Sequence, residues 1–147
     1  MRTPLAVASI SLVLVAPCWA VLGEPEETVT SDQEHLRGDL RSTLGARFSV
    51  HEISASDGTT VREYASPAGI VFGVSWQGPF VPDLAHLLGS YFTEFQEAGR
   101  SPARPRRPLA LRTAHLAIEM GGHMRAFHGR VYLPASLPEG VSESDIR

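Results

Sequence analysis

One amphipathic pattern constrains the fold of this chain more than any other feature. Between Asp83 and Ala98, apolar side chains recur at the i, i+3, i+4, i+7 spacing of one helix face. They are Leu84, Leu87, Leu88, Tyr91, Phe92 and Phe95. Because each such side chain gains ~1.5–3 kcal/mol on full burial, the pattern predicts one long helix lying on a sheet. Asp83 can cap its start and Gly99 can end it.

Two alternating segments before this helix predict a β-hairpin. They are "RFSVHEI" and "TVREYAS", and the turn signal "SASDGT" lies between them. A three-residue loop places Glu52 opposite Arg62, whereas a two-residue Asp57-Gly58 loop places Glu52 opposite Glu63. Like charges directly opposite each other are destabilising, so the first register is predicted.

The segment "IVFGVSW" predicts a third strand. Its larger side chains, Ile70, Phe72, Val74 and Trp76, alternate with Val71, Gly73 and Ser75. Successive side chains of a strand point to opposite faces. We therefore expect a central strand with another segment packed closely on its small face.

The C-terminal half predicts a second hairpin, which carries the metal-ligand candidates. "LALRTAHLAIEM" and "HMRAFHGRVYLP" flank Gly121-Gly122, a type I′ turn signal. That turn places His115 directly opposite His128, with Cβ atoms ~4.5–5.5 Å apart. A zinc site needs three or four protein ligands, and Glu119 on the same face is too far along the strand to converge. Two ordinary strand histidines are therefore the favoured interpretation.

Other chemistry-bearing residues give no catalytic assignment and no cofactor-binding residue. "GVSWQG" lacks the spacing of a nucleophile elbow, so Ser75 is interpreted as a packed strand serine. His86, Ser90 and Glu94 share the polar face of the predicted helix. Trp76-Gln77 could line a pocket mouth, or could end a strand and cover the core. The chain has no lysine, which excludes a Schiff-base lysine and a P-loop.

The N-terminus predicts export. Arg2 precedes an apolar run from Leu5 to Pro17, and small residues at Cys18 and Ala20 suit signal-peptidase cleavage near Ala20. The run is shorter than the ~20 residues of a spanning helix. A lipoprotein cysteine at Cys18 is the alternative, and the preceding proline disfavours it. We expect a periplasmic or secreted protein that is not membrane-spanning.

The mature chain would contain no cysteine, so neither a disulfide framework nor a thiol nucleophile is expected. A formal net charge of −3 argues against nucleic-acid binding. No cofactor is predicted, and the oligomeric state is left open.

The sequence divides into four parts. We expect a signal peptide over 1–20, a flexible acidic lead-in over 21–30, a single α+β domain over 31–134 and a loosely held polar tail over 135–147. Ser31 and Glu34 form a capping-box pattern that predicts a short helix from about Asp32 to Ser42. The fold class is α+β, with about five antiparallel strands (a hairpin plus a third strand, then the C-terminal hairpin) under the long helix.

Two stretches carry a family resemblance. "REYASPAGIVFGVSWQGPFVPDLAHLLGSYF" and "GGHMRAFHGRVYLP" resemble an uncharacterised bacterial secreted family, domain of unknown function 2844. The resemblance extends from about Leu22 to Val141. It implies a small exported proteobacterial protein and carries over no catalytic residues.

These observations predict an exported periplasmic protein that is a non-enzymatic binding or envelope-accessory protein. Its partner would be an unknown envelope protein or a small ligand. The alternatives are a small hydrolase-type enzyme, which needs a pocket where a histidine meets a serine or carboxylate, and a metal-handling protein that uses His115 and His128.

Overall fold

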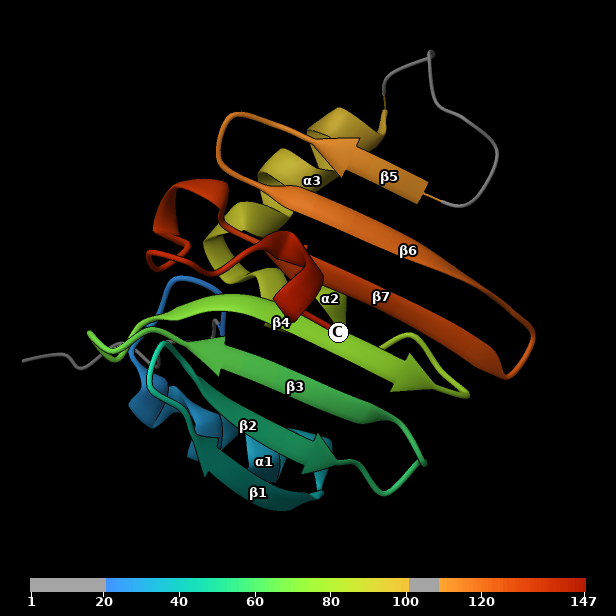
Figure 1. Ribbon diagram of the computed structural model, residues 1–147. Helices are drawn as coiled ribbons and strands as arrows, with labels where there is room; N and C mark the ends of the chain where they lie inside the picture. Colours follow the sequence, from blue (N-terminus) through green and yellow to red (C-terminus); the bar gives the residue numbers. More distant parts are fainter. Residues whose placement is uncertain (1–20, 101–108) are drawn as a thin grey trace, which may run out of the picture.

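The protein folds around one antiparallel sheet in a computed structural model that describes residues 21–100 and 109–147 (Figure 1). Seven strands lie in the order β1-β2-β3-β4-β7-β6-β5. Their bounds are Asp39–Leu44 (β1), Ser49–Ser54 (β2), Thr60–Ala65 (β3), Val71–Gly78 (β4), Leu109–Arg112 (β5), Ala117–His123 (β6) and Ala126–Tyr132 (β7). The expected signal peptide, including Cys18, lies outside the described residues.

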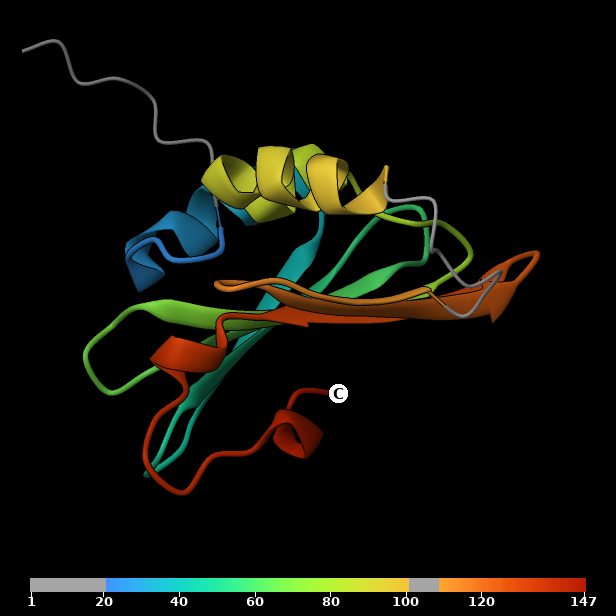
Figure 2. The same ribbon diagram turned by 90° about the horizontal axis from the view of Figure 1, so that it is seen from above.

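Helices cover one face of this sheet (Figure 2). The chain after β7, residues 133–147, covers part of the other face, and we call it the C-terminal segment. The helices are η1 (Glu26–Thr28), α1 (Val29–Leu36), α2 (Leu84–Leu88), η2 (Gly89–Tyr91) and α3 (Phe92–Gly99). Two short turns, η3 (Pro134–Ser136) and η4 (Glu143–Asp145), belong to the C-terminal segment. There are accordingly two apolar clusters. Val74, Trp76 and Leu87 belong to the helix side, and Tyr64, Phe72 and Ile146 to the other.

The expectation of about five strands under one long helix is wrong. One missed strand, β1, lies where the sequence predicted the second half of a helix ending near Ser42. Arg37 takes a left-handed conformation with φ 50° and ends α1 after Leu36. The expected helix had little apolar surface to bury. Pairing with β2 satisfies the backbone N–H and C=O groups that the helix would have bonded, so this segment forms a strand instead.

The other missed strand, β5, arises because a turn divides "LALRTAHLAIEM". Thr113 N–H donates to the Leu116 carbonyl at 2.8 Å, and the Thr113 hydroxyl accepts from Leu116 N–H at 2.9 Å. Thr hydroxyls favour such local bonds over continued strand pairing. The segment therefore becomes two antiparallel strands, β5 and β6.

The predicted long helix is also interrupted. Asp83 does cap its start, because its carboxylate accepts from Ala85 and His86 N–H. Gly89 then adopts φ 49° and ψ −119°, a conformation outside the helical region, and separates α2 from η2 and α3. The apolar stripe nevertheless packs on the sheet as expected, with Leu87 and Leu88 buried and Phe92 and Phe95 partly buried.

The first hairpin has the predicted register. Glu52 pairs with Arg62 across β2 and β3, and Arg62 Nε donates to Glu52 Oε2 at 2.7 Å. The predicted central strand is also confirmed, since β4 lies fourth of the seven. Another segment packs closely on its small face, as expected: a Cβ added at Gly73 would lie 2.9 Å from Ile146 Cδ1.

The alternation predicted for β4 fails at one point. A register shift between Tyr64 and Ala65 leaves Phe72 unpaired with β3. Val71 therefore joins the helix-side cluster and Phe72 joins the opposite one. An extra, unpaired residue of this kind is a β-bulge. It interrupts the alternation of side chains between the two faces of the sheet, so the side chains beyond it point to the opposite faces.

The second hairpin turns at Met124-Arg125, so the Gly121-Gly122 turn is wrong. β6 and β7 pair Ile118 with Val131 and Gly121 with His128. This register buries both Ile118 and Val131 in the core, whereas a two-residue turn at Gly121-Gly122 would place Ile118 opposite Arg125. It also aligns Gly129 with Trp76 of β4.

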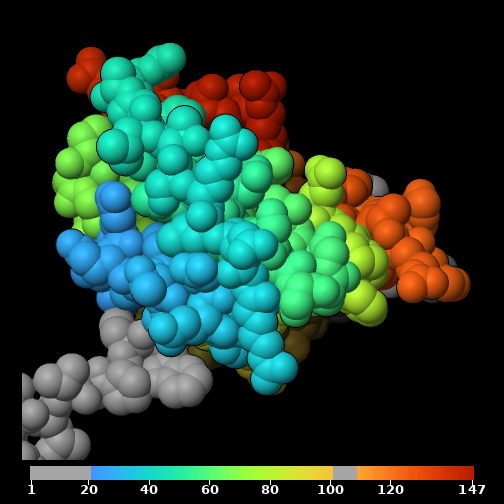
Figure 3. Space-filling view, turned by 90° about the horizontal axis from the view of Figure 1, so that it is seen from below, coloured from blue at the N-terminus to red at the C-terminus, as the bar shows by residue number. Residues whose placement is uncertain are grey.

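Both chain ends differ from expectation because their apolar side chains are buried. Val21 and Leu22 are buried in the helix-side cluster, and Gly23 N–H donates to the Val71 carbonyl at 2.8 Å. The N-terminal segment lies against the neighbouring strands as one continuous surface (Figure 3, blue to cyan). At the other end Ile146 is fully buried. Neither a flexible lead-in nor a loosely held tail describes these residues.

Gly129 provides a test of the sheet register. A Cβ added there would lie 2.2 Å from Trp76 Cζ2, so Gly129→Ala should lower the free energy of unfolding by about 1–3 kcal/mol through overpacking. Urea unfolding measures the change. His128→Ala, one residue away and exposed, should be nearly neutral. Equal effects of the two substitutions would contradict the placement of Trp76.

Candidate functional site

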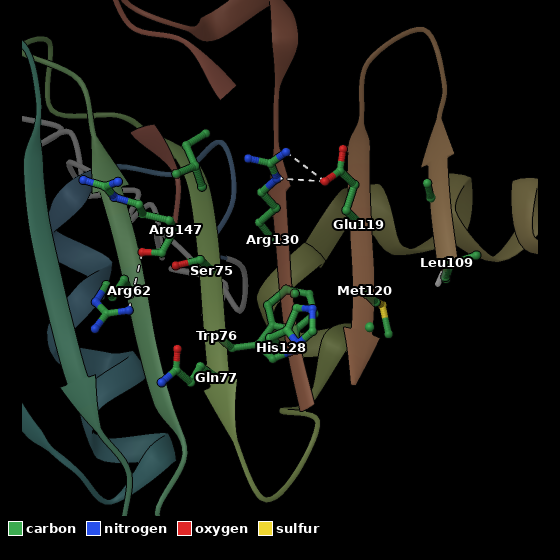
Figure 4. A pocket seen from close by; sticks show the side chains of 14 residues that line it. Arg62, Ser75, Trp76, Gln77, Leu109, Glu119, Met120, His128, Arg130 and Arg147 are labelled. Carbon is green, nitrogen blue, oxygen red and sulfur yellow. Dashed lines mark hydrogen bonds and ion pairs between the residues drawn. The ribbon is translucent and has the colours of Figure 1, made fainter. Parts of the chain in front are cut away.

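A groove of about 490 Å³ lies on the sheet face opposite the helices. The C-terminal segment covers one end of this face, and the groove occupies the uncovered part over β4, β7, β6 and β5 (Figure 4). Side chains of mixed polarity line it. They include Arg62, Ser75, Gln77, Leu109, Ala110, Glu119, His128, Arg130, Ile146 and Arg147.

On one side of the groove, an ion pair joins two neighbouring strands. Arg130 of β7 is paired with Glu119 of β6, and its Nε and Nη2 donate to Glu119 Oε2 at 3.0 and 2.8 Å. Arg130 Nη1 also donates to the Glu143 carbonyl at 2.6 Å. Arg130 therefore has a fixed orientation and ties the C-terminal segment to the sheet.

On the other side of the groove, the C-terminal segment contacts β3 through Arg147. The Tyr64 hydroxyl donates to the Arg147 carbonyl at 2.6 Å and accepts from Arg147 N–H at 2.9 Å. Arg62, already paired with Glu52, also donates to the Arg147 carbonyl at 3.4 Å. The last two residues thus form part of the groove.

A third set of contacts fastens the C-terminal segment at Glu143. Its carboxylate accepts hydrogen bonds from the Tyr132 hydroxyl and from Arg112 Nη2. The bond from Tyr132, then the one from Arg112, lowers the pKa of Glu143 below its usual range. The carboxylate therefore stays charged and bonded in mildly acidic solution.

The groove also offers unused hydrogen-bonding groups. Gln77 of β4 and His128 of β7 are directly paired and exposed, and neither side chain has a hydrogen bond within the described part of the chain. A second cavity of about 380 Å³ adjoins the groove at these two residues and continues toward the β6–β7 turn. A bound molecule could therefore be recognised by polar groups at this end and by Leu109 and Ile146 elsewhere.

The two histidines considered as candidate metal ligands, His115 and His128, do not lie opposite each other. His128 pairs with Gly121 and faces the groove. His115 precedes β6 and is exposed, with its Nδ1 3.3 Å from Glu94 Oε2 of α3. The predicted pair is wrong because the turn lies beyond the glycines. In residues 21–100 and 109–147, no three His, Cys, Asp or Glu side chains are placed to hold a metal ion.

The remaining candidates occupy different places. Ser75 is buried, as expected of a packed strand serine, and its hydroxyl lies 3.3 Å from that of Tyr64. Both Trp76 and Gln77 line the groove, and Trp76 also packs in the helix-side core. His86 was expected on a polar surface but is buried against Asp32 of α1.

Sequence reasoning missed the C-terminal contribution to the groove. Ile146 and Arg147 lie in a polar stretch without a helix or strand period, so no pattern marks them. The cross-strand charges were the only available signal: Glu119 and Arg130 would have been paired by the rule that selected the Glu52–Arg62 register.

The chain belongs to the family described as a protein of unknown function, domain of unknown function 2844, whose model matches residues 18–146. This confirms the resemblance seen in the sequence. No curated protein and no solved structure matches the chain. Among the described helices, none is long and apolar enough to cross a membrane.

Ile146→Ala tests whether the C-terminal segment is part of the folded core. The fully buried side chain leaves a cavity when truncated, so the free energy of unfolding should fall by about 2–5 kcal/mol. Chemical denaturation is the measurement. Glu139→Ala, an exposed position in the same segment, is the control. A loss below ~1 kcal/mol for Ile146→Ala would be incompatible with the described packing.

Proposed function

We propose that this protein is an exported, non-enzymatic binding protein of the bacterial envelope that holds a ligand in the groove. The observation that carries the proposal is a sizeable groove with unused polar groups between fixed side chains. Gln77 and His128 line the groove without a side-chain hydrogen bond to any other described residue, while the Arg130–Glu119 pair is held in place. Binding sites commonly combine apolar lining with a few oriented polar groups.

The groove suits a small ligand of mixed polarity. The charges of Arg62 and Arg130 are already balanced by Glu52 and Glu119, so these residues shape the site more than they attract a strong anion. The polar end at Gln77 and His128 would bind a hydrogen-bonding group. Leu109, Ala110 and Ile146 would contact an apolar part.

Export is supported by the N-terminal sequence, because Arg2 followed by an apolar run ending at Pro17 is typical of a signal peptide. Intact-mass analysis of protein from the periplasm of an expression host checks this. A product that starts near Val21 is expected, and a full-length cytoplasmic product would contradict export while leaving the groove open to test.

Filling the groove should abolish ligand binding. Ala110 pairs with Glu119 and shares its face of the sheet, so Ala110→Phe projects a ring into the groove. The probe is anilinonaphthalene sulfonate, a fluorescent molecule with apolar and polar parts. We expect the variant to bind it at least tenfold more weakly, a loss of about 1.4 kcal/mol.

The matched control is Thr43→Phe, an exposed strand position outside the groove. It should bind the probe as the unmodified protein does. Undiminished binding by Ala110→Phe, with unchanged unfolding behaviour, would place the ligand elsewhere and remove the basis of the proposal.

A hydrolase is the second candidate function, because one histidine contacts both a serine and a carboxylate. Ser42 Oγ lies 2.8 Å from His51 Nδ1, and His51 Nε2 lies 3.5 Å from Glu26 Oε1. Such an arrangement can activate a serine nucleophile. Ser42 belongs to an edge strand, however, and lines neither cavity described above.

A fluorophosphonate probe distinguishes the two functions. If the protein is a binding protein only, the probe does not modify Ser42. Intact-mass analysis should then show no added mass in either the unmodified protein or Ser42→Ala. Stoichiometric labelling that Ser42→Ala and His51→Ala both abolish would favour the hydrolase instead.

A further inference from the structure

The contact between α1 and the sheet combines buried polar groups with the two apolar side chains of the helix, Val29 and Leu36. Four buried titratable residues lie together there, and we call them the buried polar cluster: Asp32 of α1, His51 of β2, Glu63 of β3 and His86 of α2. Apart from Asp32, the only buried residue of α1 is Val29. The docking of α1 therefore depends on how these polar groups are charged. Figure 3 shows the outer side of this region, where the atoms of α1 (blue) lie beside those of β1 (cyan).

Glu63 is the least compensated member of the cluster. It is fully buried in the middle of β3, opposite His51 on one side and Val74 on the other. Neither carboxyl oxygen has a hydrogen-bond partner in the described part of the chain. Burial, with the negative charge of Asp32 adding to it, raises the pKa of Glu63 to about 9. The group is therefore neutral at pH 7.

The two buried histidines near Glu63 contact side chains other than its carboxyl. His86 Nε2 lies 2.6 Å from Asp32 Oδ1, and this hydrogen bond raises the pKa of His86, so the pair links α2 to α1. His35 stacks on His86 with ring centroids 4.0 Å apart, and the Asp83 charge also favours protonated His86. His51 contacts Ser42 and, from η1, Glu26.

We propose that Glu63 is a proton-binding site that controls the docking of α1: with Glu63 protonated the helix lies on the sheet, and loss of that proton releases it. An ionised Glu63 would place a second negative charge near Asp32, and its carboxylate has no hydrogen bond or ion pair within the described part of the chain. Buried unpaired charges are costly. Opening α1 lets water reach the carboxylate and exposes only two apolar side chains of that helix, Val29 and Leu36, so this local opening is favoured over global unfolding.

The direction of the pH dependence follows from the two raised pKa values. Protonated Glu63 stabilises the docked form, and the undocked carboxyl, being hydrated, titrates near its ordinary 4.5. Docking therefore weakens as the pH rises from 4.5 to about 9. The contribution of His86 is complete below its ordinary pKa and is lost as the pH rises through its raised one. Both groups favour release at alkaline pH.

Hydrogen exchange on the full chain tests the proposal. Between pH 7 and about 9, protection factors of α1 amides should fall about tenfold per pH unit, the linkage expected for one proton. They should be lower than those of β4 and insensitive to low urea, which marks a local opening. Glu63→Gln should remove most of the slope. Glu34→Gln, an exposed carboxyl on α1, should retain it.

Two results would overturn the proposal. One is a slope in Glu63→Gln equal to that of the unmodified protein, and the other is identical protection of α1 and β4, which would mean that α1 opens only with the whole fold. Should Glu63→Gln not fold, the ¹³C shift of the Glu63 carboxyl in the unmodified protein decides the matter. A titration midpoint near 4.5 would refute a proton held at neutral pH.

Discussion

The burial of β4 on both faces is the constraint on which the rest of the structure depends. A strand with no solvent-facing side needs a layer on each side of the sheet. The helices supply one layer, and the C-terminal segment supplies the other through Ile146, which closes over Gly73. Trp76 then selects the neighbouring register, because its ring leaves room only for Gly129 on β7. The second layer is short, so part of the sheet face stays open as the groove.

The features of the fold that could be predicted from the sequence are those that local interactions determine. The Glu52–Arg62 register followed from charge alone, and the central position of β4 followed from its large and small side chains. The β6–β7 turn did not follow, because the contact of Trp76 with Gly129 outweighs the local preference of Gly121-Gly122. Tertiary packing of this kind leaves no periodic signal. For the same reason, the sequence located Gln77 as a pocket candidate but missed Arg147.

β3 connects the groove and the buried polar cluster. Arg62 and Tyr64 point to the groove side and hold the C-terminal segment, while Glu63 between them points to the helix side. Because successive side chains of a strand point to opposite faces, neighbouring residues of β3 contribute to the groove and to the buried polar cluster. On the groove side Arg62 and Arg130 are ion-paired, whereas on the helix side the Glu63 carboxyl has no hydrogen-bond partner among the described residues. The two proposals accordingly concern opposite faces and can fail independently.

The bonding of Arg147 to Tyr64 has a practical consequence for handling the protein. Both the N–H and the carbonyl of Arg147 bond to the Tyr64 hydroxyl, directly after buried Ile146. A bulky group attached at Arg147 would lie beside the groove, which this residue lines. Purification handles and immobilisation linkers are therefore better attached elsewhere, for example within the exposed β2–β3 connection near Ser56.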